Sequence, residues 1–404
     1  MADVILGIDF GTSCTSAGAL VGDRVELIQD GGDVVIPSVV YVPERGPLEI
    51  GRRAQMRLLK DPTGVIRSVK RVLGVATDSP LVRHFAASAA FRVETTGNRL
   101  TFKLRATQYA PEQIAGAILT HVRELAEIRF GGRVCKAVIT ASAAAPPGYR
   151  DALIRAARIA HLDVLEVVPE PIAGALAVGL HAEAAERKLI VCDFGGGTFD
   201  VSALVQSGLR FTPIATTGDQ YLGGDDLDIE IAEALAGLIS KKAGYDLHRD
   251  AVRWSELLFR CEMAKRQLTV ETEVPFVMRE AYVDQGRTQH LDFLLDRPWV
   301  EARWAPLFAR AVTVIEAALA RAGWQPGDVD RIALIGGSSL VPMFHRTVCA
   351  LFPDQPVLVS PRADVSVALG AVLLTARFGS ERRDVPVLDL PLPVPTTRSL
   401  SRPT

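Results

Sequence analysis

Two short segments of the chain combine an acidic residue with glycines and hydroxyl side chains. Residues 9 to 13 read DFGTS and residues 193 to 198 read DFGGGT. Glycines let backbone amides approach an anion without a β-carbon in the way, and consecutive amides in a turn form a concave nest for oxygen. Mg²⁺ prefers hard oxygen ligands and keeps several of its waters. The segments therefore predict a polyphosphate site with a divalent ion, served by one carboxylate from each segment, Asp9 and Asp193.

The same two segments supply the backbone and hydroxyl groups expected to contact phosphate. These residues are Gly11, Thr12, Ser13, Gly195, Gly196, Gly197 and Thr198. The alternative is a pair of ordinary glycine-rich hairpins, but the presence of two copies favours a shared ligand. No GxxxxGK[ST] sequence occurs, so a P-loop fold is not expected.

The elements around these segments repeat. VILGIDFGTSCTSAGALV, near the start, and LIVCDFGGGTFDVSALV, at 189 to 205, each read as a strand, a glycine-bearing turn and a second strand. This layout indicates an internal duplication. We expect two related α/β lobes whose hairpins face each other and hold one ligand from two sides.

Helices and buried strands fill the rest of the chain. An amphipathic helix is predicted over 111–132, which begins with proline and ends in glycines. The other expected elements are a buried strand at 136–142, a helix at 148–162, an apolar helix between layers at 170–180, a strand and glycine turn leading to a helix that starts at Pro342, and an apolar helix over 364–378 capped by Asp364.

Composition excludes several classes of function. With 404 residues and 48% hydrophobic content the chain can bury a large core in two or more domains. A formal net charge of -2, without a basic stretch interleaved with aromatics, gives no reason to expect nucleic acid as a partner. The five scattered cysteines argue against a zinc site or disulfides. We expect no signal peptide, no membrane span and a cytoplasmic location.

Ten sequence blocks together resemble one family. They are GIDFGTS, IPSVVYV, VIRSVKRVLG, YAPEQIAGAIL, VVPEPIAGALAVGL, DFGGGTFDVSAL, TTGDQYLGGDDLD, CEMAKRQLT, LIGGSSLVP and ADVSVALGA. In this order and spacing, from residue 4 to about 390, they resemble the ATPase domain of the 70-kDa heat-shock chaperones of DnaK type, within the actin and sugar-kinase superfamily.

The resemblance implies a fold and its boundaries. It implies a two-lobed actin-like ATPase with ribonuclease H-like duplicated lobes and four subdomains around a central nucleotide cleft. Lobe I is expected over 1–183, with 360–383 returning to it, and lobe II over 184–359. A proline-rich, linker-like tail is expected over 384–404.

The resemblance also implies roles for the acidic and basic residues. Asp9 and Asp193 correspond to the carboxylates that hold Mg²⁺ through its waters, and Lys70 to the lysine near the γ-phosphate and the attacking water. Glu170 and Asp200 correspond to acidic residues that order the water and the ion, and Thr198 to a γ-phosphate contact. Without the family, Lys70 reads as part of a solvated basic face, Glu170 as a helix-start carboxylate and Asp200 as a turn residue.

A second group of residues is predicted to bind the nucleoside. Glu262, Lys265, Arg266 and Thr269 are spaced to lie on one helical face, which is either an exposed face with a Glu262–Arg266 ion pair or, by the resemblance, a wall for the adenosine. The predicted set is completed by Gly223, Gly224, Gly336, Gly337, Ser338, Leu340 and Asp364.

Three features depart from the family pattern. Leu340 stands in place of an arginine that stacks on adenine, which predicts nucleotide binding weaker by roughly 0.5 to 2 kcal/mol. Ser142 stands in place of a proline that works with Arg150 and Glu170 to relay nucleotide state. Fourteen residues follow Leu390, and Pro386 interrupts the linker-like segment, so the chain is expected to lack a peptide-binding domain, whether as a fragment or as a lidless ATPase.

The leading hypothesis is a Mg²⁺-dependent ATPase of DnaK type that binds ATP or ADP and acts in protein folding. Its expected partners are a J-domain co-chaperone and a nucleotide-exchange factor, and unfolded clients only if another polypeptide supplies the peptide-binding domain. The alternative is a nucleotide-sensing module with little turnover. An actin-type filament former and a sugar kinase fit the sequence less well.

Overall fold

The computed structural model describes residues 4–22, 24–179, 186–208, 210–360 and 362–378. Within these ranges helices and strands alternate along the chain, and the largest sheets contain both parallel and antiparallel strands. The prediction of a mixed α/β fold is therefore confirmed.

The first large sheet contains the first glycine-bearing hairpin. Its strand order is β12-β11-β1-β2-β3, and β4 also pairs with β2. The strands are β1 (Ile5–Phe10), β2 (Cys14–Val21), β3 (Arg24–Leu27), β4 (Ile36–Pro37), β11 (Lys136–Ala141) and β12 (Asp163–Pro169). β1 runs antiparallel to β2 and parallel to β11.

The second large sheet repeats this arrangement, with the order β15-β14-β13-β18-β19. Its strands are β13 (Arg187–Phe194), β14 (Phe199–Ser207), β15 (Arg210–Asp219), β18 (Arg331–Ile335) and β19 (Val357–Val359). β13 is antiparallel to β14 and parallel to β18, so each strand of the second sheet has a counterpart in the first, where β4 is an additional strand. An internal duplication predicts this correspondence.

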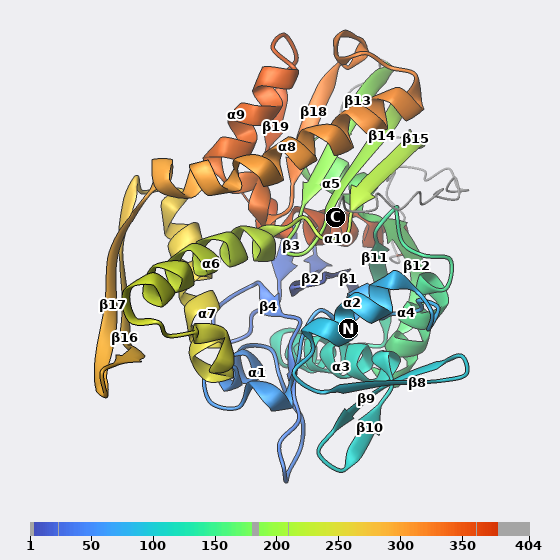
Figure 1. The fold of residues 1–404 in the computed structure, drawn as a ribbon. Helices are drawn as coiled ribbons and strands as arrows, with labels where there is room; N and C mark the ends of the chain where they lie inside the picture. The colour runs from blue at the N-terminus through green and yellow to red at the C-terminus, as the bar shows by residue number, and fades with distance from the viewer. Residues whose placement is uncertain (1–3, 23, 180–185, 209, 361, 379–404) are drawn as a thin grey trace.

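Two apolar helices lie between the large sheets (Figure 1). They are α5 (Glu170–Ala177) and α10 (Ser366–Thr375), which pack against each other. Gly370 allows this contact, because a β-carbon there would lie 1.8 Å from the carbonyl oxygen of Ala173. One hydrophobic core combines α5 and α10 with side chains from both sheets. The helices therefore join the first half of the molecule, which is built on the first large sheet, to the second half, which is built on the second large sheet.

Two further cores surround the sheets. The first core packs the first sheet against α2 (Pro80–Ser88), α3 (Pro111–Phe130), α4 (Tyr149–Ile159) and the small sheet of β8 (Arg92–Thr96), β9 (Arg99–Leu104) and β10 (Thr107–Tyr109). The second core packs the second sheet against α6 (Gly224–Ala243), α7 (Ala251–Leu268), α8 (Arg297–Ala322), α9 (Pro342–Leu351) and the hairpin of β16 (Glu273–Asp284) and β17 (Arg287–Asp296).

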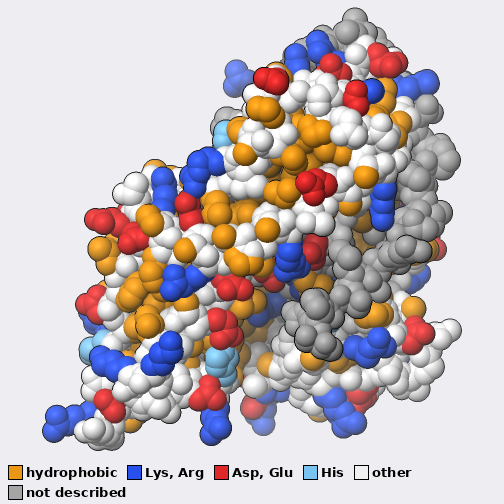
Figure 2. Space-filling model, turned by 45° about the horizontal axis from the view of Figure 1, so that its top comes forward, with side chains coloured by type: hydrophobic (Ala, Val, Ile, Leu, Met, Phe, Trp, Pro, Cys, Tyr) orange, Lys and Arg blue, Asp and Glu red, His pale blue; other side chains and the backbone are white. Residues whose placement is uncertain are grey.

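Short elements complete the described chain. A small sheet contains β5 (Val40–Tyr41), β6 (Glu49–Ile50) and β7 (Val65–Ile66), next to α1 (Arg52–Arg57). The 3₁₀ turns are η1 (Pro62–Gly64), η2 (Val69–Val72), η4 (Leu247–Arg249), η5 (Pro326–Asp328), η6 (Gly337–Leu340), η7 (Ala363–Val365) and η8 (Ala376–Phe378). On the face seen in Figure 2, acidic and basic side chains are interspersed rather than separated by sign.

Most predicted elements have the expected type, and one cap was assigned wrongly. The helix predicted over 111–132 forms as α3, and Gly131 ends it in the left-handed conformation. Asp364 does not cap the last helix, because α10 begins at Ser366 with Val365 as its N-cap residue, and the Asp364 carboxylate instead pairs with Arg362. The predicted tail at 384–404 lies outside the described residues. No helix in the described ranges is long and apolar enough to cross a bilayer.

Candidate functional site

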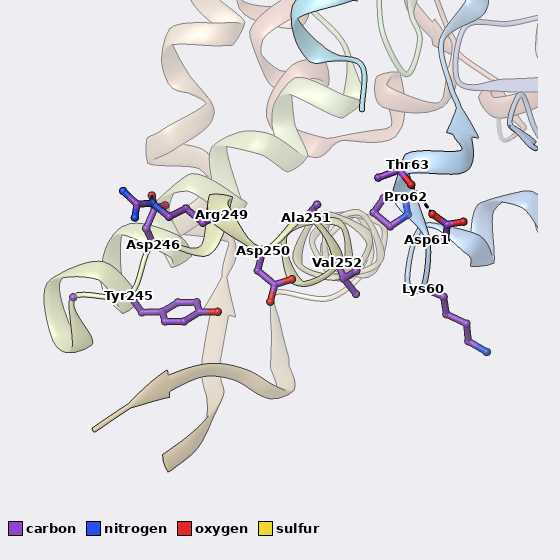
Figure 3. Close-up of a pocket in the computed structure, with 11 residues that line it drawn as sticks. Lys60, Asp61, Pro62, Thr63, Tyr245, Asp246, Arg249, Asp250, Ala251 and Val252 are labelled. Carbon is purple, nitrogen blue, oxygen red and sulfur yellow. Dashed lines mark hydrogen bonds and ion pairs between the residues drawn. The ribbon is translucent and has the colours of Figure 1, made fainter. Parts of the chain in front are cut away.

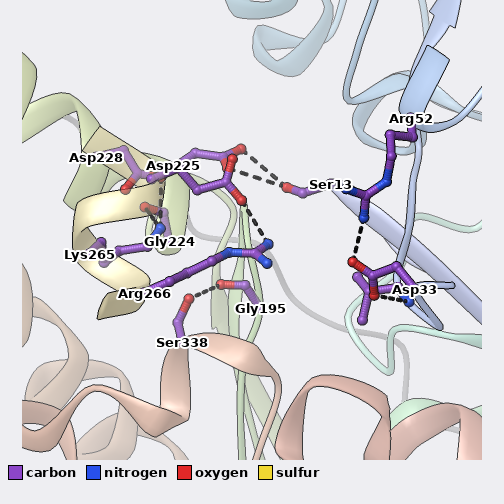
Figure 4. Close-up of polar contacts among 12 residues, drawn as sticks. Ser13, Asp33, Arg52, Gly195, Gly224, Asp225, Asp228, Lys265, Arg266 and Ser338 are labelled. Atoms are coloured by element: carbon purple, nitrogen blue, oxygen red, sulfur yellow. Dashed lines mark hydrogen bonds and ion pairs between the residues drawn. The ribbon is translucent and has the colours of Figure 1, made fainter. Parts of the chain in front are cut away.

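The turns of the two equivalent hairpins face each other at close range. A β-carbon at Gly196 would lie 2.4 Å from Ser13 Oγ, and one at Gly197 would lie 3.1 Å from Thr12 Cγ2. The Ser13 hydroxyl donates to Asp225 Oδ2 at 3.2 Å, which links the first turn to the start of α6 (Figure 4). The structure therefore brings the two predicted phosphate-binding segments together.

Ser38 supports the first turn. Its hydroxyl donates to the Gly11 carbonyl at 2.9 Å and lies 2.9 Å from Thr15 Oγ1. Its backbone N–H donates to the Ser13 carbonyl at 2.9 Å. These contacts orient the backbone of DFGTS from one neighbouring segment.

Several separate segments support the second turn. The Gly195 carbonyl accepts from the Gly224 N–H at 3.0 Å and from the Ser338 hydroxyl at 2.8 Å. The Gly196 carbonyl accepts from the Asp225 N–H at 2.6 Å. These contacts explain the place of Gly223 as well, because a β-carbon there would lie 2.5 Å from the Gly196 carbonyl oxygen.

Asp9 and Asp193 occupy equivalent positions, each one residue before the end of its strand. Burial, reinforced by the charge of Glu170, raises the pKa of Asp9 from 3.8 to about 7, although Lys70 and a hydrogen bond from Thr140 oppose the shift. Burial and three acidic neighbours raise the pKa of Asp193 well above its ordinary value. The charge of Asp9 adds to the cost of ionising Asp193, and a cation held by both carboxylates would lower that cost.

Lys70 lies within this acidic cluster rather than on a solvated face. Its Nζ donates to Glu170 Oε1 at 2.7 Å, and both side chains are largely buried. Burial opposes the charge of Lys70, but Glu170, Tyr149 and Asp9 outweigh it and raise the pKa of the ammonium. A permanent cation is therefore held beside the carboxylates.

Asp200 lies opposite Asp193 in the pairing of β13 with β14. Burial and the charge of Glu170 raise its pKa from 3.8 to about 7, while the Ser142 hydroxyl, which donates to Oδ2 at 2.9 Å, opposes the shift. The other oxygen, Oδ1, is buried and has no hydrogen-bond partner among the residues that the structure describes. Asp200 therefore retains an acceptor for a proton, a water or a hydrated ion.

The donor set fits a hydrated divalent cation. Three aspartates with raised pKa values and Glu170 surround Lys70, so these five residues carry excess negative charge when ionised. Among the described residues, no three acidic, histidine or cysteine side chains are grouped to ligate a metal directly. Mg²⁺ keeps several of its waters, so these carboxylates can hold it through those waters without being grouped as direct ligands.

The predicted nucleoside wall is divided between two environments. On α7, Arg266 is exposed and donates to Glu262 at 2.7 Å, and the Thr269 hydroxyl donates to the Arg266 carbonyl. Lys265 is instead buried, and its Nζ donates to Asp228 and to the Gly224 carbonyl, each at 2.7 Å. The Glu262–Arg266 ion pair expected from spacing is present, whereas Lys265 supports the start of α6.

The glycine turn after β18 lies beside the carboxylate cluster. Gly336 has a φ of 81°, and a β-carbon there would lie 2.6 Å from Asp193 Oδ1. A β-carbon at Gly337 would meet no atom closer than Asp364, at 3.8 Å, which is an ordinary van der Waals contact. The Leu340 side chain is 37% exposed, so it is available to cover a ligand.

A cavity of about 760 Å³ lies elsewhere, between residues 60–63 and residues 244–252 (Figure 3). Its lining includes residues at the start of α7, whereas Glu262 and Arg266 belong to the other end of that helix. None of the predicted phosphate or metal residues lines it. It is therefore separate from the candidate site.

A family model described as Hsp70 protein matches residues 5–399. This chain belongs to the Hsp70 family. Members of the family are ATPases that bind adenine nucleotides and act as chaperones with co-chaperones, so this Hsp70 chain is an ATPase.

The three residues of the predicted relay, Ser142, Arg150 and Glu170, make their hydrogen bonds to residues outside the relay. Ser142 contacts Asp200, Arg150 donates to the Val167 carbonyl at 3.3 Å, and Glu170 accepts from Lys70. Sequence patterns do not connect Ser142 with Asp200, because the two residues are 58 positions apart and Ser142 follows β11 in the first sheet, whereas Asp200 lies on β14 in the second.

Sequence reasoning missed several residues that hold the site in place. Ser38, Arg71, Thr140 and Asp225 all contact a predicted site residue in the structure. The GGDD segment was a weak signal for Asp225, and the basic run SVKR was one for Arg71. Ser38 and Thr140 belong to apolar runs, where a hydroxyl gives no indication of its partner.

Proposed function

We propose that this chain is a Mg²⁺-dependent ATPase of DnaK type that hydrolyses ATP between the two facing hairpins. The observation that carries the proposal is the convergence of the two glycine turns above one buried cluster of carboxylates with Lys70. The turns offer amides and hydroxyls to phosphate, and the carboxylates offer oxygen to a hydrated cation.

Each residue of the cluster has a role in this proposal. Asp9 and Asp193 hold the hydrated Mg²⁺, which supplies charge neutralisation to the phosphate oxygens. Lys70 is held by Glu170 with its charge facing the cluster, where it stabilises negative charge that develops on the phosphoryl oxygens. Asp200, with a raised pKa and a free acceptor oxygen, accepts a proton from the attacking water. Thr12, Ser13 and Thr198 bind the phosphates.

The nucleoside is proposed to lie between the α7 face and the turn after β18. Glu262, Arg266 and Thr269 offer polar groups to the ribose and the base. The open backbone at Gly337 and the exposed Leu340 give the base an apolar surface on the other side. Because leucine replaces a cation here, we expect weaker nucleotide binding than in family members with arginine at this position.

Lobe boundaries, location and specific partners also remain proposals. The matched strand orders support two lobes, over 1–183 with 360–383, and over 184–359. The family membership supports a J-domain co-chaperone and a nucleotide-exchange factor as partners. Five free cysteines are compatible with a reducing cytoplasm.

Phosphate release from ATP by the purified chain tests the function. The wild type should turn over ATP only with Mg²⁺, and Lys70→Ala should lower turnover by about 100-fold. Lys70→Met, which keeps the length of the side chain, separates loss of charge from loss of packing. Lys60→Ala, a lysine at the separate cavity, serves as the matched control and should behave as wild type.

The second candidate function is a nucleotide sensor with little turnover, which Leu340 and Ser142 favour because both depart from the family pattern. A wild type that binds ADP but is no faster than Lys70→Ala would replace the ATPase proposal with this one. Addition of a J-domain protein to the same assay tests coupling, and an unchanged rate would remove that partner.

A further inference from the structure

The backbone of Arg71 lies beside the first core, and its side chain reaches the second glycine turn. The turn η2 contributes Val69 and Val72 to the first core, which fixes the backbone of Arg71 there. Its guanidinium Nη2 donates to the Gly197 carbonyl at 2.7 Å, in the turn between β13 and β14. Arg71 thus connects the first half of the molecule directly to the second glycine turn.

The ring of Tyr221 contacts two side chains of the first half, those of Arg71 and His84. Arg71 Cζ lies 5.5 Å from the ring centroid, and the ring of His84, on α2, lies 4.1 Å away between centroids. Tyr221 itself is fixed to the second half, because its N–H donates to Asp219 and its carbonyl accepts from Arg310. Separation of the halves must therefore break both ring contacts.

The contact with Arg71 determines the orientation of one peptide in the glycine turn. The Gly195 and Gly196 carbonyls accept from Gly224, Asp225 and Ser338, all in the second half. The Gly197 carbonyl accepts from Arg71. In a trans peptide the N–H of the next residue points opposite to the carbonyl, so this contact directs the Thr198 N–H away from Arg71. Glycine alone would leave that peptide free to rotate.

We propose that Arg71, held against Tyr221, positions the Gly197–Thr198 peptide for phosphate and thereby controls how fast bound nucleotide leaves. The inference rests on the proposed function, because it assigns the released ligand to the cleft between the glycine turns. Arg71 is a positioning residue: it acts through the turn, and its contact is lost when the halves separate.

Dissociation of fluorescently labelled ADP, chased with unlabelled ADP in a stopped-flow instrument, tests the proposal. Arg71→Ala should accelerate dissociation about tenfold, because it removes a charge-assisted hydrogen bond and a cation–π contact. Tyr221→Leu should accelerate it about threefold. Arg67→Ala is the matched control, since Arg67 is an exposed arginine four residues earlier, and it should leave the rate unchanged.

A double-mutant cycle shows whether Arg71 and Tyr221 act together on ADP dissociation or independently of each other. If the effect of Arg71 on dissociation requires its contact with Tyr221, Tyr221→Leu should accelerate dissociation little further when it is added to Arg71→Ala. Thermal unfolding of each variant should confirm that it is folded. Fully multiplicative effects, or an Arg71→Ala rate equal to that of Arg67→Ala, would overturn the proposal. A wild type that binds no ADP would instead refute the proposed function, so the two failures are distinguishable.

Discussion

The first and second glycine turns connect equivalent strands but are supported in different ways. The first has one glycine and is oriented by Ser38, from a neighbouring segment of the same half. The second has three glycines and is oriented by contacts from α6, from the turn after β18 and from Arg71 in the other half. The backbone of the first turn is therefore held within its own half, although the Ser13 side chain also contacts Asp225 in the other half. The backbone of the second turn, in contrast, has a contact from the other half, through Arg71.

The carboxylates below the turns provide the largest test of this difference. Asp9 accepts a hydrogen bond from Thr140 at 3.3 Å, while among the described residues the Asp193 carboxylate has no such donor. Asp9→Asn and Asp193→Asn should each lower Mg²⁺-dependent turnover by about 100-fold. Without metal, both should instead stabilise the protein at pH 8, and Asp193→Asn should do so more, because no hydroxyl donor among the described residues offsets the burial of Asp193.

The sign of this stability effect follows from the raised pKa values. A carboxyl whose pKa is higher in the folded state ionises first in the unfolded chain, so the free energy of unfolding falls as pH rises from 3.8 toward about 7 for Asp9. Asparagine removes that dependence. Urea unfolding in EDTA at pH 5 and pH 8 measures it, and variants less stable than wild type at pH 8 would contradict it.

The glycines themselves provide the second test. A β-carbon at Gly11 would lie 2.1 Å from the Cys14 carbonyl oxygen within its own turn, whereas at Gly196 it would meet Ser13 Oγ across the interface. Gly11→Ala should therefore lower the thermal unfolding midpoint. Gly196→Ala should mainly push the turns apart and weaken ADP binding about tenfold, which is about 1.4 kcal/mol.

Calorimetric titration of ADP measures this effect, and the double variant Gly196→Ala with Ser13→Gly serves as the control. Removal of the Ser13 side chain makes room for the new β-carbon. Gly196→Ala should therefore weaken ADP binding much less when it is added to Ser13→Gly than when it is added to the wild type. If the double variant binds no better than Gly196→Ala, the contact between the turns does not limit binding.

The sequence predicts the elements that carry a repeated motif or a periodic hydrophobic pattern, which here are the two hairpins and α3. The DFG pairs, the proline at the start of α3 and the glycine at its end are local signals, and the hairpins and α3 formed as expected. Lys70, Glu170 and Asp200 were placed in the site only through the resemblance, because their neighbours in space are distant in sequence. The error at Asp364 has a similar cause: an acidic residue before an apolar run is a good cap, but here Arg362 pairs with it.

The hydroxyls that orient the two turns provide a third test, in which the free energy of unfolding should change by about 1 kcal/mol. Ser38→Ala leaves the Gly11 carbonyl without that donor and should lower the free energy of unfolding by about 1 to 2 kcal/mol. Ser338→Ala should cost less, about 0.5 kcal/mol, because the Gly195 carbonyl still accepts from the Gly224 N–H. Urea unfolding of the two variants compares them, and equal losses would show that the second turn is not supported redundantly.

The smallest expected effect concerns α7, which extends the second half toward the first turn. Glu262 and Arg266 belong to α7, yet both charges act on the Cys14 thiol. Burial, and next the charge of Glu262, raise the pKa of Cys14 to about 12, while the charge of Arg266 opposes the shift. Their ion pair is partly exposed, so Glu262→Gln should change the free energy of unfolding by less than about 0.5 kcal/mol.

The same substitution should nevertheless weaken ADP binding about threefold, because a carboxylate facing the cleft is a better acceptor for ribose hydroxyls than an amide. Arg260→Gln, which breaks a similar i,i+4 pair with Glu256 earlier on α7, is the matched control. If both variants bind ADP as wild type does, the α7 face is only a solvated surface, and the nucleoside must be held by the turn after β18 alone.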